Sequence, residues 1–394
     1  MTNNNENEND NDYNNVKIFP SFDDMDLKDN LLRSIYGYGF EKPSAIQQRA
    51  IVPLYKGGDV LAQAQSGTGK TATFSIGILQ KVRDDLVCQA IILAPTRELA
   101  KQIHSVISEL SKYMEINVYL CIGGQSVSDD IYELRNGGHQ IIVGTPGRIL
   151  DMMHREAIRA DDLHILVLDE ADEMLTRGFK EEIYKIFQQI PENVQVGLFS
   201  ATLPPDTLDI SKKFLRNPTR ILVKKEGLTL DGIKQFYLMI EKDEWKFEAL
   251  CELYDQMNVG QSIVYCNKKQ RVEELATALI ENDFQVAYIH GEMNQEERNR
   301  IMKGFRASES RVLITTDLLA RGIDVQGVNV VINFDIPFKR ENYIHRIGRS
   351  GRYGRKGVSL NFVTPKDAEQ LENIENYYST SITELPEDFE KYFR

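Results

Sequence analysis

The amino-acid sequence predicts an α/β protein made of two tandem, doubly wound parallel-sheet domains joined by a flexible linker. Short aliphatic runs alternate with helical patterns along most of the chain. Strands separated by helices are typical of a parallel sheet that is covered on both faces. The alternation stops once, at 223–232, and then starts again, which indicates two sheets. A length of 394 residues is enough for two or three domains with separate cores.

A disordered tail is expected over 1–18, because this segment is rich in Asn and acidic residues and has almost no apolar pattern. We expect the first domain over 19–222. A helical pattern over 72–79 follows its first strand. The strands predicted for this domain are 59–64, 90–94, 117–122, 140–143, 164–169 and 195–199.

The linker is predicted at 223–232, where charges and two glycines interrupt the alternation. The second domain is expected over 233–394. It has no Gly-Lys-Thr loop, so we expect a sheet of the same kind without a nucleotide site of its own. Its predicted strands are 261–266, 285–290, 311–315, 329–333 and 357–363, and its clearest helical patterns are 269–281 and 295–306.

The chain is acidic, with a formal net charge of −12. A protein that bound nucleic acid through bulk electrostatics should be basic. Any nucleic-acid site must therefore be a local groove whose positive charge is offset elsewhere. One segment is a candidate, and its basic residues are Arg321, Lys339, Arg340, Arg346, Arg349, Arg352, Arg355 and Lys356.

The composition argues against a membrane or secreted protein. No apolar run approaches the roughly 20 residues needed to span a bilayer. The amino terminus resembles neither a secretory signal nor a basic transit peptide. Of the cysteines Cys88, Cys121, Cys251 and Cys266, none has zinc-ligand spacing. Cys121 and Cys266 belong to apolar runs, so we expect small core residues in a soluble, intracellular protein.

A glycine-rich loop is expected to hold the phosphates of a nucleotide. It follows the first predicted strand and ends in Gly-Lys-Thr at the start of a helical pattern. Its backbone N–H groups can wrap a phosphate, Lys70 can reach the β and γ phosphates, and the Thr71 hydroxyl can ligate Mg²⁺. The predicted loop residues are Ala64, Gln65, Ser66, Gly67, Thr68, Gly69, Lys70 and Thr71.

Two adjacent carboxylates, Asp169 and Glu170, come directly after the apolar run 165–168. Burial of that run places them at the carboxyl edge of the sheet, where ligands bind in open α/β folds. A nucleotide hydrolase needs one carboxylate to hold Mg²⁺ and another to orient the attacking water. We therefore predict an ATPase that uses ATP and Mg²⁺, with Asp169 and Thr71 as metal ligands and Glu170 on the water.

The second domain is expected to close over a nucleotide that is bound to the first. Arg349 and Arg352 are three residues apart and would be near neighbours on one helical face. An arginine delivered across a cleft stabilises the charge that develops on a transferring phosphoryl group. We therefore predict catalytic roles for both arginines, together with Lys70 and Glu170.

The run Asp169-Glu170-Ala171-Asp172 resembles the signature of the DEAD-box RNA helicases, and the resemblance extends from about Phe22 to the end of the chain. It implies two RecA-like domains and an RNA-dependent ATPase with helicase activity. The other segments that resemble motifs of this family, in the family's order, are 39–47, 95–100, 123–124, 145–148, 200–202, 263–267, 295–298, 320–324 and 345–352.

The resemblance assigns further residues to the nucleotide. Gln47 lies in a segment similar to the family's adenine-reading motif, and its side-chain amide can pair with N6 and N7 of adenine, which favours ATP over GTP. Phe40 or Phe22 would cover the base. Lys42 belongs to the same nucleotide-binding segment, and Asp324 is implied at the ATP ribose.

The other motif residues are implied to bind RNA or to act in coupling. Contacts to the RNA backbone give affinity without sequence readout, and the 2′-hydroxyl separates RNA from DNA. The implied RNA-binding residues are Pro95, Thr96, Arg97, Gly124, Thr145, Gly147, Arg148, Arg298, Thr315 and Gly322. Asp172, Ser200 and Thr202 are implied to couple hydrolysis to strand separation, and His345 joins the implied catalytic set.

Within the family, the chain is most similar to members that act in translation initiation, followed by an exon-junction relative. This implies a monomer that binds mRNA without sequence preference and unwinds short duplexes in the cytoplasm, with the nucleus as the alternative. The implied partner is a scaffold protein of the initiation factor 4G type. Two other functions stay open: an ATP-gated RNA clamp in an exon-junction or similar assembly, and a DNA translocase.

Overall fold

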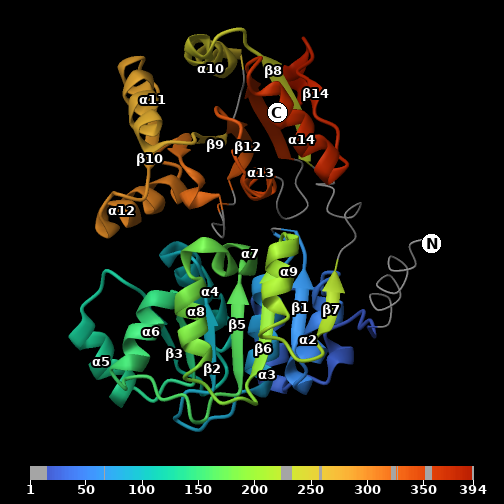
Figure 1. Ribbon diagram of the computed structural model, residues 1–394, viewed down its shortest axis with the longest axis vertical. Coiled ribbons are helices and arrows are strands. Elements are labelled where there is room, and N and C mark those ends of the chain that lie inside the picture. Colours follow the sequence, from blue (N-terminus) through green and yellow to red (C-terminus); the bar gives the residue numbers. More distant parts are fainter. Residues whose placement is uncertain are drawn as a thin grey trace, which may run out of the picture. The chain divides into compact units, whose positions relative to one another are not determined.

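The computed structural model describes residues 16–65, 67–222, 233–256, 260–320, 325, 327–350 and 357–392. The chain divides into two compact units, Met1–Val223 and Lys224–Arg394 (Figure 1). The tail predicted over 1–18 lies outside the described residues up to residue 15, and the linker predicted at 223–232 lies wholly outside them. Each unit has its own sheet and its own cores.

The first unit contains a wholly parallel sheet of seven strands in the order β3-β4-β2-β5-β6-β1-β7. Its central strands are completely buried, because helices cover both faces. This arrangement confirms the predicted α/β class. The strands are β1 (Val60–Gln63), β2 (Ala90–Leu93), β3 (Val118–Cys121), β4 (Ile141–Gly144), β5 (Ile165–Asp169), β6 (Gln195–Ser200) and β7 (Thr219–Leu222).

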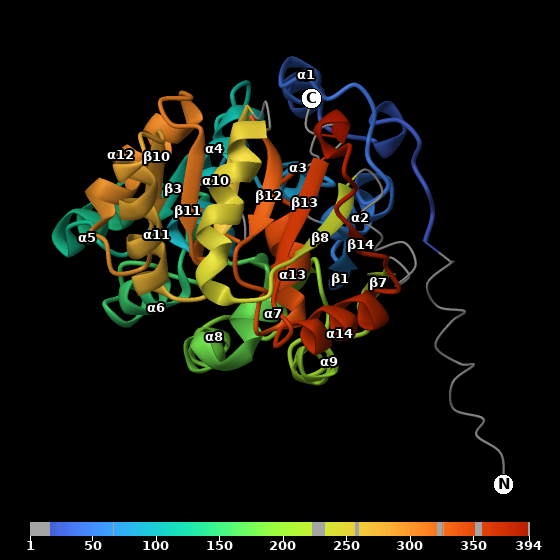
Figure 2. The same ribbon diagram turned by 90° about the horizontal axis from the view of Figure 1, so that it is seen from above.

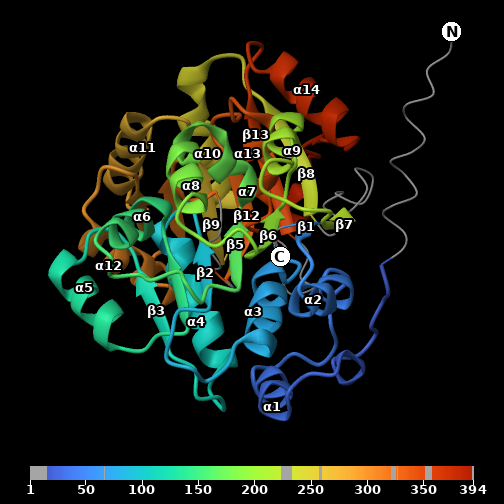
Figure 3. The same ribbon diagram turned by 60° about the horizontal axis from the view of Figure 1, so that its bottom comes forward.

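Alternate residues of these strands face two separate cores. In β5, Val167 packs into one core, whereas Leu166 and Leu168 pack into the other. Figure 3 shows α3 and α4 on one side of β5 and α8 on the other. The helices of this unit are α1 (Asp29–Gly37), α2 (Gln47–Lys56), α3 (Lys70–Lys81), α4 (Arg97–Leu110), α5 (Val127–Asn136), α6 (Pro146–His154), α7 (Ala171–Glu173), α8 (Lys180–Phe187) and α9 (Pro205–Ser211).

The second unit repeats the design with another parallel sheet of seven strands, in the order β10-β11-β9-β12-β13-β8-β14. Residues of β12 alternate between its two cores in the same way as those of β5. The strands are β8 (Ile233–Met239), β9 (Gln261–Tyr265), β10 (Val286–Ile289), β11 (Val312–Thr315), β12 (Val328–Asn333), β13 (Gly357–Val363) and β14 (Thr383–Glu384).

Helices cover both faces of the second sheet. Side chains of α10 and α11 fill one core, and those of α12, α13 and α14 fill the other. Figure 2 shows these helices around the strands of the second sheet. A short 3₁₀ turn, η5 (Asp243–Trp245), precedes α10, and another, η6 (Asp317–Leu319), follows β11. The helices are α10 (Lys246–Gln256), α11 (Lys269–Glu281), α12 (Gln295–Arg306), α13 (Arg340–Ile347) and α14 (Ala368–Tyr378).

Three strands of the structure are absent from the sequence-based expectations. β7 and β14 extend the edges of the sheets, and β8 opens the second unit. The burial pattern of β8 is irregular, since it combines buried, half-buried and exposed positions without alternation. Such strands have no strong hydrophobic period to reveal them.

The described cysteines are all free thiols, and two of them are core residues as predicted. Cys121 and Cys266 are fully buried, and burial raises the pKa of both thiols, so they are inert. Among the described residues, none of the helices has the length and apolar character required to cross a membrane.

Candidate nucleotide and RNA site

The segments predicted to bind a nucleotide meet at the carboxyl edge of the first sheet. The glycine-rich loop follows β1, the carboxylate pair follows β5, and the segment 200–202 follows β6. β5, β6 and β1 are consecutive in the sheet. Parallel strands end at the same edge, so three segments that are far apart in the sequence become neighbours.

The side chain of Lys70 forms hydrogen bonds within the glycine-rich loop. Lys70 begins α3, and its Nζ donates hydrogen bonds to the carbonyl oxygens of Ala64, at 2.7 Å, and Gln65, at 3.4 Å. The hydroxyl of Thr68 also donates to the Gln65 carbonyl, at 2.7 Å. Gly69, the N-cap of α3, has φ = 95°, a conformation that only glycine adopts without strain. Gly67 has φ = 83°, and Ser66 lies outside the described residues.

Gln47 contacts this loop directly. Its Oε1 accepts a hydrogen bond from the backbone N–H of Ser44, at 2.7 Å. Its Nε2 lies 3.5 Å from the carbonyl oxygen of Gly69. A Cβ at Gly69 would lie 2.6 Å from the same Nε2. The glutamine that is predicted to read adenine is therefore packed against the loop that is predicted to hold phosphate.

The two aromatic candidates for covering the base differ in accessibility. Phe22 is fully buried in a core and lies edge-on to Tyr36, so the expectation that it covers the base is wrong. Phe40 is half-buried and stacks on Tyr38 with ring centroids 4.9 Å apart. Of the pair, Phe40 alone retains ring surface for a base. Lys42 is exposed in the loop before α2.

Asp169 ends β5 and is buried, with 2% of its surface exposed. Burial raises the pKa of its carboxyl group, the neighbouring Glu170 raises it further, and Lys70 opposes the shift. A buried carboxylate at this position is suited to a divalent cation, because a cation offsets the desolvation of the charge. Thr71, in the first turn of α3, is half-buried and supplies a hydroxyl on the same edge.

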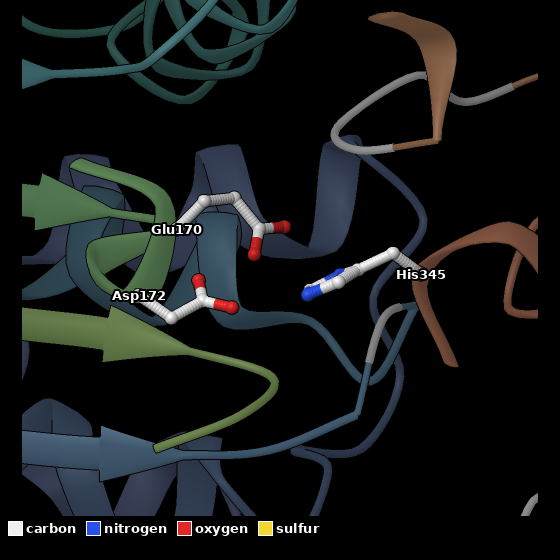
Figure 4. A group of neighbouring side chains, drawn as sticks. All are labelled: Glu170, Asp172 and His345. Carbon is white, nitrogen blue, oxygen red and sulfur yellow. The ribbon is translucent and has the colours of Figure 1, made fainter. Parts of the chain in front are cut away.

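Glu170 adopts a left-handed backbone conformation, with φ = 53°, and its N–H donates a 3.0 Å hydrogen bond to Oδ1 of Asp169. This conformation turns the chain sharply out of β5. The carboxylates of Glu170 and Asp172 both lie beyond the end of the strand (Figure 4). His345, also drawn there, belongs to α13 of the second unit.

Asp172 is joined to the segment after β6 by two side-chain hydrogen bonds. Its Oδ1 accepts from the Ser200 hydroxyl at 2.8 Å, and its Oδ2 accepts from the Thr202 hydroxyl at 2.5 Å. The Thr202 N–H also donates to the Ser200 hydroxyl oxygen, at 3.3 Å. The three residues implied to act in coupling therefore form one buried group, so a shift of either segment displaces the other.

The segments implied to bind RNA occupy the other half of the same edge. They follow β3, β4 and β2, which are consecutive strands. Pro95 and Thr96 follow β2, and Thr96 caps α4 by accepting from the Leu99 N–H at 3.2 Å. Thr145 is the N-cap residue of α6 and is half-buried, and Gly147 is exposed in the first turn. β2 is the last strand of this RNA half, and its neighbour β5 is the first strand of the nucleotide half.

Arg97 packs against the glycines that follow β3. A Cβ at Gly124 would lie 2.7 Å from Nη1 of Arg97, and one at Gly123 would lie 3.3 Å from Nη2. Gly124 also has φ = 85°. Glycine at this position therefore permits both the turn and the close approach of the guanidinium.

Arg148 is held within the protein. Its guanidinium forms an ion pair with Asp130, which is buried, and donates a 3.0 Å hydrogen bond to the carbonyl oxygen of Gln125. Asp130 also accepts a hydrogen bond from Tyr119, at 2.7 Å. Arg148 therefore secures the chain just after Gly124. Sequence reasoning missed Asp130, because an acidic residue in a polar helix carries no signal of burial.

The RNA-binding candidates of the second unit lie on different elements. Arg298 is a buried residue of α12. Thr315 ends β11, is fully buried, and donates a hydrogen bond to the carbonyl oxygen of Thr316 at 3.1 Å. Gly322 lies outside the described residues, as do Asp324, the implied ribose ligand, and Arg321.

The catalytic candidates of the second unit flank the end of α13. His345 lies in its last turn, but α13 ends at Ile347, so Arg349 lies in the following turn. The expectation of one helical face for Arg349 and Arg352 is therefore wrong for Arg349, and Arg352 lies outside the described residues. Nε of Arg349 donates a 3.1 Å hydrogen bond to the carbonyl oxygen of His345.

Among the described residues of the basic segment predicted to line a groove, Arg346 and Arg349 are buried. Arg346 is fully buried and forms an ion pair with Asp317, at 2.5 Å. Arg340 lies over the ring of Tyr377, 3.6 Å from its centroid. Arg355 and Lys356 lie outside the described residues. The number of basic residues in the sequence therefore overstates the charge offered to a polyanion.

Two parallel-sheet units, one with a phosphate loop and an Asp-Glu pair on the same sheet edge, define a nucleotide-hydrolysing class of protein. The family described as DEAD/DEAH box helicase matches residues 44–210. The family described as helicase conserved C-terminal domain matches residues 245–354. The chain therefore belongs to the DEAD-box helicase family.

Curated relatives show which members of the family this chain is similar to. Eukaryotic initiation factor 4A of Caenorhabditis elegans is 59% identical over 94% of this chain and 92% of its own length. The ATP-dependent RNA helicase eIF4A of Aspergillus clavatus is 57% identical over 94% of this chain and 93% of its own length. These relatives place the chain among the eIF4A-like, ATP-dependent RNA helicases.

Solved structures of related helicases share the fold. Dbp5 of S. cerevisiae, bound to RNA and ADP BeF3, matches with a TM-score of 0.90 at 37% identity, over 95% of this chain and all of that chain. Mss116p, bound to ssRNA and AMP-PNP, matches with a TM-score of 0.83 at 26% identity, over 93% of this chain and 78% of that chain. These likenesses confirm the predicted pair of RecA-like domains.

Proposed function

We propose that this eIF4A-like helicase binds ATP at the carboxyl edge of the first sheet and uses its hydrolysis to separate short RNA duplexes during translation initiation. The observation that carries the proposal is the convergence of Lys70, Asp169 and the Asp172–Ser200–Thr202 group on three adjacent strands. At this edge, Lys70 would bind phosphate, and Asp169 supplies a buried carboxylate. The Asp172–Ser200–Thr202 group links the segment after β5 to the segment after β6 by hydrogen bonds.

The proposed nucleotide site uses the loop 64–71 for the phosphates, Gln47 and Phe40 for adenine, and Lys42 beside them. Asp169 and Thr71 would hold Mg²⁺, which would neutralise phosphate charge when bound. The fit rests on the burial of Asp169 at the end of β5, since a cation relieves the burial of its charge. Asp324 is proposed at the ribose.

The proposed chemistry begins with Glu170, whose carboxylate orients a water molecule and accepts its proton as the water attacks the γ-phosphate; the bond from the γ-phosphorus to the bridging oxygen breaks, and ADP leaves. Lys70 would leave the Ala64 carbonyl and hold the phosphates. His345, Arg349 and Arg352 of the second unit are proposed to act on the same phosphate, with 223–232 as a flexible linker that permits closure. The arginines would stabilise the charge that develops on the transferring group.

RNA is proposed to lie across both units. In the first, Pro95, Thr96, Arg97, Gly124, Thr145, Gly147 and Arg148 would contact its backbone, and the ion pair of Arg148 with Asp130 would also hold this surface in place. In the second, Arg298, Thr315 and Gly322 complete the proposed contacts. RNA bound to Dbp5 and Mss116p in their solved structures supports this assignment. Contacts of this kind are indifferent to sequence, so mRNA in general is the proposed substrate.

The Asp172–Ser200–Thr202 group is proposed to couple the two activities, because it joins the segment after Glu170 to the segment after β6. We also propose a monomer in the cytoplasm, with a scaffold protein of the initiation factor 4G type as partner. The names of the curated relatives support this role.

The test is to measure ATP turnover with and without single-stranded RNA, together with separation of a short RNA duplex. We expect RNA to stimulate turnover and ATP to be required for strand separation. Stimulation by DNA to the same extent would overturn the RNA assignment. Stable RNA binding with ATP but no strand separation would favour a clamp over a helicase.

A further inference from the structure

A single buried guanidinium fastens α13 to the carboxyl edge of the second sheet. Arg346 has no exposed surface. Its Nε pairs with Oδ1 of Asp317 at 2.5 Å. Its Nη1 donates to the carbonyl oxygen of Asp335 at 2.7 Å and to Oδ1 of Asn333 at 3.2 Å. These partners lie at or just beyond the ends of β11 and β12, so one side chain holds the helix against two strands.

The remaining guanidinium nitrogen is held by Asn267, which follows β9. Oδ1 of Asn267 accepts a hydrogen bond from Nη2 of Arg346 at 2.7 Å. Its Nδ2 donates to the carbonyl oxygen of Ile336 at 2.8 Å, and its backbone N–H donates to Oδ2 of Asp335 at 2.9 Å. Both ends of the amide are therefore used, which fixes the rotation of Arg346 and the chain that leads into α13.

The orientation of α13 decides where the proposed catalytic arginine lies. Arg346 follows His345 directly and precedes Arg349 by one helical turn. Nε of Arg349 bonds to the carbonyl oxygen of His345, at 3.1 Å. The backbone N–H of Arg349 bonds to the carbonyl oxygen of Arg346, at 3.1 Å. Arg349 therefore takes its position from the turn that Arg346 fastens.

We infer that Asn267 and Arg346 are positioning residues for ATP hydrolysis: they hold the last turn of α13 so that Arg349 is presented correctly, and neither contacts the nucleotide. The inference rests on the role proposed for Arg349. It also assigns a role to the segment 263–267, because the side chain of Asn267 binds Arg346 and the chain before α13.

The same region supplies a matched control. Lys246 is buried and pairs with Asp243 at 3.1 Å, Asp367 at 3.6 Å and Asp335 at 3.9 Å. Arg271 also pairs with Asp335, at 3.0 Å, so Asp335 keeps a cationic partner when Lys246 is replaced. Lys246→Met removes a buried cation of α10 whose ion pairs are with carboxylates and not with Arg346 or Asn267. It should lower thermal stability and leave turnover by the folded protein unchanged.

The first experiment measures kcat and KM for ATP, with saturating RNA, in the full-length chain. Arg346→Lys keeps the charge and the pair with Asp317, but it loses the forked bonds to Asn267 and Asp335. We expect kcat to fall about 10- to 100-fold with KM within about twofold of the parent value, as for a misplaced catalytic group. Asn267→Ala should do the same without altering any charge, and it serves as the test if Arg346→Lys does not fold.

A second experiment separates positioning from a general structural role. Each change is repeated in an Arg349→Ala background, where residual turnover no longer depends on the arginine. Positioning predicts that Arg346→Lys then changes turnover by less than about twofold. An equal fold loss in both backgrounds would show a structural role alone and would overturn the inference.

The outcomes also distinguish failure of the positioning role of Asn267 and Arg346 from failure of the catalytic role proposed for Arg349. If Arg349→Ala leaves turnover unchanged, the catalytic role proposed for Arg349 fails. If Arg349→Ala lowers turnover but Arg346→Lys and Asn267→Ala both keep the parent kcat, positioning fails and the proposed function stands.

Discussion

The Nζ of Lys70 lies 2.7 Å from the carbonyl oxygen of Ala64, within the loop that Lys70 itself terminates. The bond satisfies a buried ammonium group, and the field of Lys70 also reaches Asp169, whose pKa it lowers against the effect of burial. A phosphate that displaced the Ala64 carbonyl would give the same ammonium an ionic partner. We therefore expect Lys70 to exchange the Ala64 carbonyl for a phosphate oxygen when a nucleotide binds.

Replacing this lysine tests that exchange. Lys70→Ala removes the cation that would follow the developing charge on the γ-phosphate, so we expect ATP turnover to fall by about 10²- to 10³-fold. Steady-state phosphate release with saturating RNA measures the effect. Residual turnover above about a tenth of the parent rate would show that another group holds the phosphates.

Gly69→Ala should impair nucleotide binding through local sterics. The residue has φ = 95°, and its new Cβ would lie 2.6 Å from Nε2 of Gln47. We expect a loss of ATP affinity of about 5- to 30-fold, because the loop or Gln47 must move, at a cost of about 1–2 kcal/mol. Titration with a fluorescent nucleotide measures it. Gly178→Ala is the control, since nothing lies within 4 Å of that Cβ position; equal losses in both variants would contradict the argument.

Glu170→Gln should separate binding from hydrolysis. The amide keeps the shape of the side chain and leaves Asp169 in place, but it cannot accept a proton from water. We expect turnover to fall by about 10²- to 10⁴-fold, the usual contribution of a general base. RNA binding in the presence of ATP should persist, as measured by anisotropy of a labelled strand. Loss of RNA binding in parallel with turnover would instead identify Glu170 as structural.

Asp169→Asn should stabilise the protein in the absence of nucleotide and Mg²⁺. Burial raises the pKa of Asp169 above its ordinary value of 3.8, so the ionised carboxylate destabilises the folded state. This effect is absent below pH 3.8, grows as the pH rises, and is complete above the raised pKa. We expect a gain of about 1–3 kcal/mol at neutral pH that disappears in acid, together with loss of ATP turnover. Chemical unfolding of the variant and the parent protein, at neutral pH and in acid, measures this gain in the free energy of unfolding. An equal gain at both pH values would exclude titration of Asp169 as the cause.

Strands with a clear hydrophobic pattern can be predicted from the sequence, and strands without one cannot. β5 is predictable because its buried aliphatic run ends at two carboxylates. β8 is not, since its exposed and half-buried positions follow no period, and β14 has only two residues. These strands form by pairing along their length with neighbours from distant parts of the chain, which a local pattern does not encode.

The site shows the same division between local and long-range information. The loop 64–71 and the Asp169–Glu170 pair are local patterns next to strands, so their places at the sheet edge follow from sequence. Charged residues with distant partners do not. The sequence does not reveal that Arg148 pairs with the buried Asp130, or that Arg346 is buried and makes four hydrogen bonds. An arginine in the sequence does not indicate whether its guanidinium faces solvent or a buried acceptor.

The cooperation of the two units gives the last prediction. Arg349→Ala should lower RNA-stimulated turnover by about 10³-fold, at the lower end for loss of an arginine finger. Nucleotide affinity without RNA should change little, because the residues proposed to bind adenine and to hold the phosphates in the loop 64–71 belong to the first unit. Turnover with and without RNA, alongside nucleotide titration, measures both effects. Arg306→Ala, an exposed arginine at the end of α12, is the control for loss of a charge from the second unit. Equal effects of the two changes would mean that net charge matters and that Arg349 has no specific role in hydrolysis.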